Sequence, residues 1–140
     1  MNNPGPFELS KTFVHLEADQ TARPIAVTET FWQELSSGKL AHLEEGRLLS
    51  SYSFSEDWNV WEMHPSGEEL VCLLSGAVDF VLEQSGTHSV IELRSAGSFI
   101  LVPRGVWHTA KARAPSSMMF ITPGEGTDHR PVSNGDFSGK

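Results

Sequence analysis

Short apolar runs separated by turn residues fill the chain from Arg47 to Thr122, and this pattern constrains the fold more than any other feature. Many short strands with glycine and proline between them are typical of an all-β sandwich or barrel, and eight suit a jelly roll of two Greek keys. No stretch of helical period lies between the runs, which disfavours a parallel sheet with crossover helices. The eight runs are 48–54, 60–64, 70–74, 78–82, 89–93, 99–102, 106–110 and 118–122.

The residues before and after this region differ from it in composition. The chain begins with prolines, a glycine and few apolar residues, and it ends in a polar stretch rich in glycine. Such segments pack loosely unless something ties them down. The predicted parts are therefore an N-terminal extension at 1–46, the barrel at 47–123 and a polar C-terminal strap at 124–140.

The N-terminal extension contains one strand-like segment and one helix candidate. Residues 12–16 alternate weakly and suit an edge strand, on which His15 is expected to be exposed or to face a partner. A short helix is predicted at about 29–37, because Thr28 can cap its start and Gly38 can end it. Its apolar face would consist of Phe31, Trp32 and Leu35.

Length, charge and cysteine usage exclude several classes of protein. A chain of 140 residues predicts one domain. The net charge of −8, from 18 acidic and 10 basic residues without a basic stripe, argues against nucleic acid or an anionic membrane as a partner. No apolar run can cross a membrane and the first residues do not read as a secretory signal, so a cytoplasmic location is expected. Cys72, the only cysteine, lies in an apolar run and is expected in the core.

Three potential metal ligands lie close together in the stretch from Glu62 to Glu69. Glu62 and His64 are two positions apart, so on a strand they face the same way with Cα atoms ~6.6 Å apart. The turn signal Pro65-Ser66-Gly67 follows at once and would bring Glu69 back beside them. This stretch therefore predicts part of a compact site for a small cation.

A fourth candidate, His108, follows a second tight turn. Pro103 fixes φ for the first central position of this turn, and Gly105 accepts positive φ. In a small jelly roll His108 could then face the interior near the first three candidates. Arg104, in the turn itself, could meet an anionic substrate, although a solvated turn residue is the simpler interpretation.

These two stretches resemble the motifs of the cupin superfamily, and specifically those of a small single-domain cupin with the type-2 conserved barrel. The second family motif, G-x5-P-x-G-x2-H-x3-N, is matched by Gly97, Pro103, Gly105 and His108, and departs only at Ala112. The first, G-x5-H-x-H-x(3,4)-E-x6-G, is matched by His64, Glu69 and Gly76, and departs at Glu56 and Glu62. The resemblance covers about residues 47 to 123.

The resemblance implies a double-stranded β-helix, or jelly-roll barrel, with a metal bound by Glu62, His64, Glu69 and His108. Glu62 stands where the family has a histidine, so it is either the fourth ligand or a catalytic base beside a bound water. Imidazole and carboxylate together suit Fe, Mn, Ni or Zn, and the sequence does not choose among them. Four polar groups in an apolar barrel would also be costly to bury without a cation or hydrogen-bond partners.

Two functions are consistent with this pattern. The first is a small-molecule metalloenzyme, dioxygenase-like or isomerase-like, that acts on an oxygen-rich substrate. The second is a non-catalytic ligand-binding or sensing cupin with a structural metal or none. The resemblance and the apolar extension also predict a homodimer. Trp58 is expected at the rim of the pocket, and Trp61 is expected to face away from it, into a subunit interface.

Overall fold

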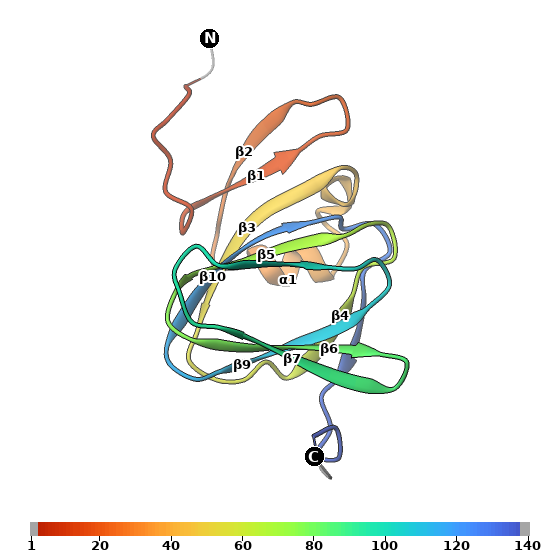
Figure 1. The fold of residues 1–140 in the computed structure, drawn as a ribbon. Helices are drawn as coiled ribbons and strands as arrows, with labels where there is room; N and C mark the ends of the chain where they lie inside the picture. The colour runs from red at the N-terminus through yellow and green to blue at the C-terminus, as the bar shows by residue number, and fades with distance from the viewer. Residues whose placement is uncertain (1–2, 138–140) are drawn as a thin grey trace.

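The computed structural model describes residues 3–137, which form two antiparallel sheets (Figure 1). The six-stranded sheet has the order β2 (Ala22–Ala26), β1 (Thr12–Leu16), β3 (Arg47–Phe54), β10 (Ser116–Thr122), β5 (Glu69–Ser75), β8 (Phe99–Val102). The five-stranded sheet has the order β11 (Asp128–Pro131), β4 (Val60–Met63), β9 (Trp107–Ala112), β6 (Val78–Gln84), β7 (Thr87–Leu93). The predicted all-β class is therefore confirmed.

The strand pairing is nested, and this nesting defines the barrel. β3 pairs with β10, β4 with β9, β5 with β8 and β6 with β7. A chain paired in this way is one long hairpin that has been rolled up, which is the topology of a jelly roll. Each of the eight predicted runs corresponds to one of these eight strands.

The turns that the sequence singles out use glycine for its backbone freedom. Gly105, between β8 and β9, has a φ of 76°, as expected for that turn. Gly76, just after β5, has a φ of 92°, and a Cβ there would collide with the carbonyl of Pro115 and with Ser116. Only glycine meets both demands at this position without strain.

The extension has a small core of its own. Strand β1, helix α1 (Phe31–Ser36) and the 3-10 helix η1 (Ala41–Glu44) bury a cluster of Phe13, Phe31, Leu43 and Leu48. Helix α1 is shorter than the predicted 29–37 and begins after Thr30, not Thr28. Phe31 and Leu35 of the predicted apolar face pack within the chain, whereas Trp32 remains 41% exposed.

Two expectations about individual side chains are wrong. His15 is buried, because the chain returns over β1 and the Glu45 carbonyl accepts a hydrogen bond from its ring. Trp58 is partly buried and packs against Phe80 and Phe120 of the barrel core, and its place at a pocket rim stays a prediction. Cys72 is only half-buried, because strand alternation places its neighbours Val71 and Leu73 in the core.

The C-terminal segment covers Trp61. The expectation that Trp61 faces away from the pocket holds, but its cover comes from the same chain. Trp61 is fully buried, its indole N–H donates to Asp136 Oδ2 at 2.9 Å, and the Phe137 ring stacks on it. Part of the predicted strap is thus strand β11 and part is this cover, while residues 138–140 lie outside the described residues.

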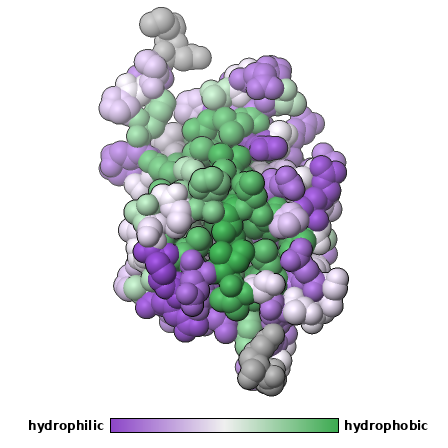
Figure 2. Space-filling model, viewed as in Figure 1, coloured by the Kyte–Doolittle hydropathy of each residue, from purple (hydrophilic) through white to green (hydrophobic). Residues whose placement is uncertain are grey.

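The six-stranded sheet is apolar on both faces. Its inner face supplies Val71, Leu73, Met118 and Phe120 to the barrel core. Figure 2 shows apolar side chains gathered in a band over strands of this sheet. The side of the six-stranded sheet that faces away from the barrel core is called the outer apolar face. It consists of Val14, Leu49, Leu70, Cys72, Phe99, Leu101, Met119 and Ile121. Neither helix of the described residues has the length and hydropathy that a membrane span requires.

Candidate metal centre

The four predicted ligands come from three strands of two sheets. Glu62 lies on β4, directly opposite His108 on β9 in the five-stranded sheet. His64 follows β4 at once, and Glu69 opens β5 in the six-stranded sheet. Strand alternation explains why Glu62 and His64 share a side, and the turn at 65–68 carries the chain across to the other sheet.

The donor atoms of these residues converge. The Glu69 Oε1 atom lies 3.2 Å from His108 Nε2 and 3.4 Å from His64 Nε2. The Glu62 Oε1 atom lies 3.9 Å from His108 Nε2. One ligand atom from each of Glu62, His64 and His108 lies within 4.8 Å of the others. The structure thus brings together all four residues that the sequence singled out.

The converging atoms make no hydrogen bond within the described residues. His64 Nε2, His108 Nε2 and Glu69 Oε1 are all buried, and each has only the charge of the others at 3.2 to 3.4 Å from Glu69 Oε1. Buried polar atoms are normally satisfied, and one left alone costs about 1–3 kcal/mol. A cation between the three would satisfy them together, and two imidazoles with a carboxylate suit Fe, Mn, Ni or Zn better than Ca or Mg. The residues therefore fit a transition-metal ion.

The electrostatics of the site follow from burial and from the pairing of opposite charges. Burial alone would raise the pKa of Glu69, but interaction with His108 and His64 outweighs it and lowers the pKa to about 2. Burial alone would lower the pKa of His108, but the Glu69 carboxylate outweighs it and raises the pKa. Without metal, the two groups therefore form a buried ion pair over the acidic to neutral range.

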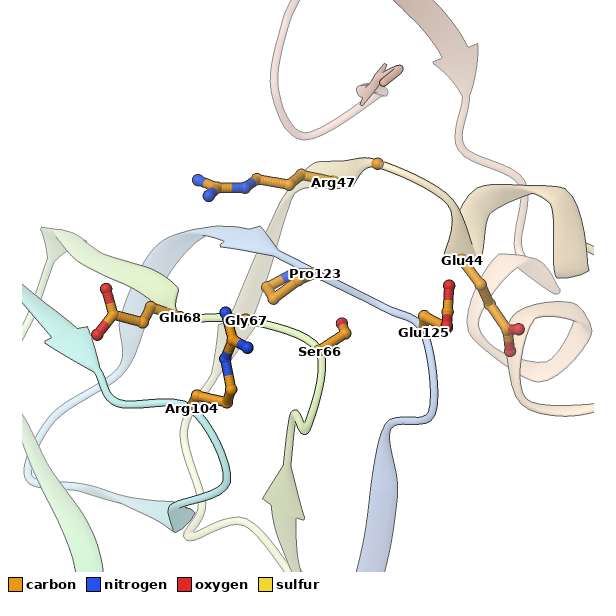
Figure 3. Close-up of a pocket in the computed structure, with 9 residues that line it drawn as sticks. Glu44, Arg47, Ser66, Gly67, Glu68, Arg104, Pro123 and Glu125 are labelled. Carbon is orange, nitrogen blue, oxygen red and sulfur yellow. The ribbon is translucent and has the colours of Figure 1, made fainter. Parts of the chain in front are cut away.

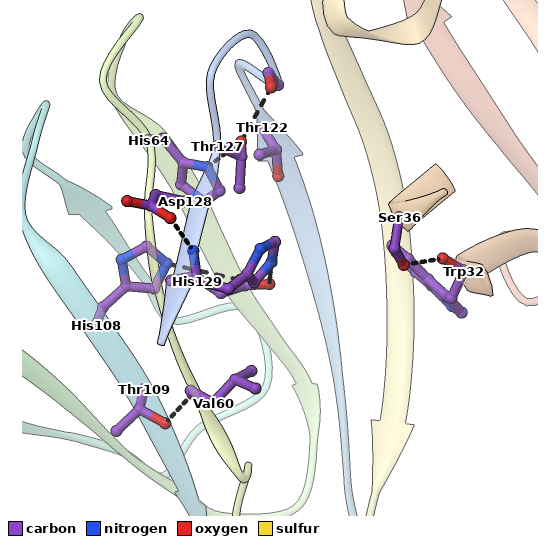
Figure 4. Close-up of polar contacts among 12 residues, drawn as sticks. Trp32, Ser36, Val60, His64, His108, Thr109, Thr122, Thr127, Asp128 and His129 are labelled. Atoms are coloured by element: carbon purple, nitrogen blue, oxygen red, sulfur yellow. Dashed lines mark hydrogen bonds and ion pairs between the residues drawn. The ribbon is translucent and has the colours of Figure 1, made fainter. Parts of the chain in front are cut away.

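Three further residues touch the site, and sequence reasoning missed them. The Thr122 hydroxyl donates to Glu69 Oε2 at 2.6 Å, Thr127 Oγ1 lies 2.9 Å from His64 Nδ1, and His129 Nε2 lies 3.2 Å from Glu62 Oε2. Figure 4 shows Thr127 beside His64, with His108 and His129 nearby. The sequence of β11 contains no apolar residue, so no strand signal pointed to this segment.

A cavity of about 430 Å³ lies against the turn between His64 and Glu69 (Figure 3). Arg47 and Arg104 line it, and neither makes an ion pair or hydrogen bond within residues 3–137. The other four arginines all pair with carboxylates. In Figure 3 the two arginines lie on one side, and Glu44 and Glu125 lie on the other. Arg104 is exposed, as expected of a turn residue, but it faces this cavity.

Comparison with known proteins gives a likeness of fold. No protein-family model matches the sequence, and no curated protein matches it. A cupin-2 domain protein from Shewanella frigidimarina is 22% identical, with a TM-score of 0.45 over 55% of this chain and 70% of that chain. Hydroquinone 1,2-dioxygenase from a Sphingomonas species is 16% identical, with a TM-score of 0.47 over 57% of this chain and 62% of that chain.

A third structure is somewhat more similar in shape and less similar in sequence. Peruvianin-I from Thevetia peruviana, described as a cysteine peptidase, is 12% identical, with a TM-score of 0.50 over 62% of this chain and 56% of that chain. Identities this low concern the fold alone. The jelly-roll barrel that the sequence motifs predict is shown by the nested strand pairing itself.

The stability of the metal-free protein should depend on pH through the Glu69–His108 pair. The lowered pKa of Glu69 stabilises the fold above pH 4.5, and this contribution is lost as the pH falls towards about 2. The raised pKa of His108 stabilises the fold below pH 6.5, and this contribution is lost as the pH rises through the raised value. We expect the free energy of unfolding to be greatest between these limits, with a decline of a few kcal/mol at most on either side.

Urea denaturation in the presence of a chelator, at a series of pH values, measures this profile. In Glu69→Gln the free energy of unfolding should decline less at both the acidic and the basic end of the series. The substitution removes the Glu69 carboxylate and leaves His108 without its partner. The exposed Glu92→Gln is the control and should keep the wild-type profile. A profile for Glu69→Gln that parallels the wild type would show that the pair does not stabilise the fold.

Proposed function

We propose that this chain, whose barrel has the cupin fold, is a small-molecule metalloenzyme of dioxygenase-like or isomerase-like chemistry. His64, Glu69 and His108 would hold one divalent transition-metal ion, and Glu62 would be the fourth ligand or a base. The observation that carries the proposal is the set of three buried donor atoms that converge on one spot without a hydrogen bond among them. A bound ion would supply Lewis-acid polarisation of a substrate oxygen, or activation of O2.

The residues around the centre support distinct roles for its members. His64, Glu69 and His108 are buried, and the Phe80 ring stacks on His108 at 5.5 Å, so water has little access on that side. The Glu62 side chain is 28% exposed and is the only one of the four that reaches solvent. A proton taken from a substrate therefore has an exit through Glu62, which fits a general base.

Metal content is the first test of this proposal. Protein supplied with Fe, Mn, Ni and Zn should retain about one ion per chain after dialysis, measured by elemental mass spectrometry. The double variant His64→Ala/His108→Ala should retain none, because half of the donor atoms are gone. The exposed His42→Ala is the matched control and should bind as the wild type does. A wild-type protein without stoichiometric metal under all four conditions would contradict the proposal.

Turnover then separates an enzyme from a sensor. The metal-loaded protein is screened for oxygen uptake or isomerisation with a panel of diketones and hydroxy acids. If Glu62 is the base, Glu62→Gln should keep the metal and lower the rate by about 10²-fold or more. Full metal occupancy without turnover would leave only the ligand-binding function.

A second candidate function, binding of a small anion without chemistry, has its own observation. Arg47 and Arg104 are the two arginines whose side chains have no carboxylate partner within residues 3–137, and they line the same cavity. Guanidinium groups bind carboxylate and phosphate in a planar, bidentate manner. Glu44, Glu68 and Glu125 also line the cavity, and their charge favours a small anion over a polyanion.

Calorimetric titration with phosphate and with citrate tests this second function and separates the two anion types. Arg47→Gln and Arg104→Gln should each weaken binding about tenfold, and the double variant should abolish it. Arg23→Gln, which removes an exposed arginine paired with Glu17, is the control. Absence of binding at millimolar anion concentration, or equal weakening in the control variant, would contradict this second function.

We further propose that the chain forms a homodimer through the outer apolar face. A sheet with apolar residues on both sides is normally covered on both. Phe99 and Leu101 on its edge strand β8 are 57% and 60% exposed, which leaves apolar side chains open to solvent. A second copy carries the same surface, so the contact is self-complementary about a twofold axis.

Light scattering at micromolar concentration should give twice the mass of the chain. The double variant Phe99→Lys/Leu101→Lys places charge in the contact and should give a monomer that remains folded by circular dichroism. Val90→Lys alters a residue of similar exposure on β7 of the other sheet and should remain dimeric. A monomeric wild type would rule out this assembly.

A further inference from the structure

Three side chains that follow Ile121 in the sequence contact the candidate ligands. Each of them contacts a ligand atom that points away from the centre of the site. Thr122 ends β10, His129 lies on β11, and Thr127 lies between these strands. They contact Glu69 Oε2, Glu62 Oε2 and His64 Nδ1, respectively. In each case the other side-chain donor, Oε1 or Nε2, is the one that points at the centre.

We propose that Thr122, Thr127 and His129 are positioning residues that limit each of these ligands to one donor atom. Both carboxylates would then bind an ion through a single oxygen, and His64 would bind through Nε2 only. This inference rests on the proposed metal site and concerns how that site is held. Two of the three residues, Thr127 and His129, belong to the segment that the sequence presents as a polar strap.

The hydrogen bonds of Thr127 fix the tautomer of His64. A hydroxyl has one proton, and that of Thr127 is donated to the Gly124 carbonyl at 3.0 Å. The Thr127 oxygen must therefore accept from His64, which places the ring proton on Nδ1 at 2.9 Å. Neutral imidazole then has its lone pair on Nε2, the atom that faces Glu69 and His108.

Thr122 gives Glu69 two inequivalent oxygens. Its hydroxyl donates to Oε2 at 2.6 Å, while Oε1 lies without a hydrogen bond between the two imidazoles. Glu69 is buried, so water does not compete for either oxygen. The hydrogen bond uses one lone pair of Oε2 and fixes the orientation of the carboxylate, which favours binding through Oε1 alone.

His129 acts on Glu62 in the same way, but less strongly. The two residues are directly opposite on paired strands, and the ring lies 3.2 Å from Oε2. Here the His129 side chain is 51% exposed and that of Glu62 is 28% exposed, so solvent screens the contact. Glu62 is therefore the least restrained of the four, which suits a residue that exchanges between metal and substrate.

Single-atom binding has a chemical consequence. A carboxylate that binds through both oxygens fills two coordination positions, whereas one that binds through a single oxygen fills one. Two imidazoles and two single oxygens use four positions, and a transition-metal ion can accept more. The positioning residues thus keep positions on the ion open to a small molecule.

Matched threonine variants test the inference on the full chain with cobalt(II) as the probe. Thr122→Val and Thr127→Val keep the shape and remove the hydroxyl, and each should weaken cobalt binding about 10–100-fold in a chelator competition. Thr122→Ser and Thr127→Ser restore the hydroxyl and should restore the affinity. Thr109→Val is the control, since that buried hydroxyl donates to the Val60 carbonyl beside the site but touches no ligand.

The visible spectrum of the cobalt protein provides a readout that a loss of stability does not move. Thr122→Val should weaken the d–d absorption, because a second carboxylate oxygen raises the coordination number, while Thr109→Val should keep the wild-type spectrum. Wild-type affinity and spectrum in both valine variants would overturn the inference and leave the metal site standing. A wild-type chain that binds no cobalt would overturn the site and the inference together.

Discussion

One oxygen of Glu69 lies between two imidazoles from the opposite side of the barrel, and the geometry of the candidate site depends on this contact. Glu69 opens β5 in one sheet, while His64 and His108 belong to the other. The donors meet only if the two sheets pack at the right distance and register. The barrel core of Val71, Phe80, Ala110 and Met118 sets that distance through close packing. The packing of the core therefore also sets the positions of the donor atoms in the site.

Much of the barrel could be predicted because its signals are local. Glycine and proline punctuation marks the strand ends, and the turns at Gly76 and Gly105 need positive φ, which few other residues accept. The four candidate ligands could be predicted because the spacing of Glu62 and His64 fixes a shared side and the family motif supplies His108. The contribution of Glu62 as ligand or base, the dimer, the cytoplasmic location and the absence of nucleic-acid partners remain predictions from composition, resemblance and surface.

What could not be predicted has a physical reason in each case. Cys72 lies in a run that is apolar at every position, so alternation carried no information about which side faces the core. Strand β11 has no apolar residue, and only its pairing with β4 makes it a strand. The burial of His15 could not be predicted, because the chain that covers β1 lies around Glu45, thirty residues later in the sequence. Long-range contacts of polar residues leave no periodic trace in a sequence.

The burial of Trp61 under Asp136 and Phe137 has a consequence for how the protein is made. Residues 123–137 are synthesised after the eight barrel strands β3 to β10, yet they anchor on Trp61 and contact two of the four candidate ligands, Glu62 and His64. On the ribosome, a nascent barrel can therefore close around its core before its ligands are locked in place. An ion that entered the proposed site before this stage would be held by side chains that are still free to rearrange.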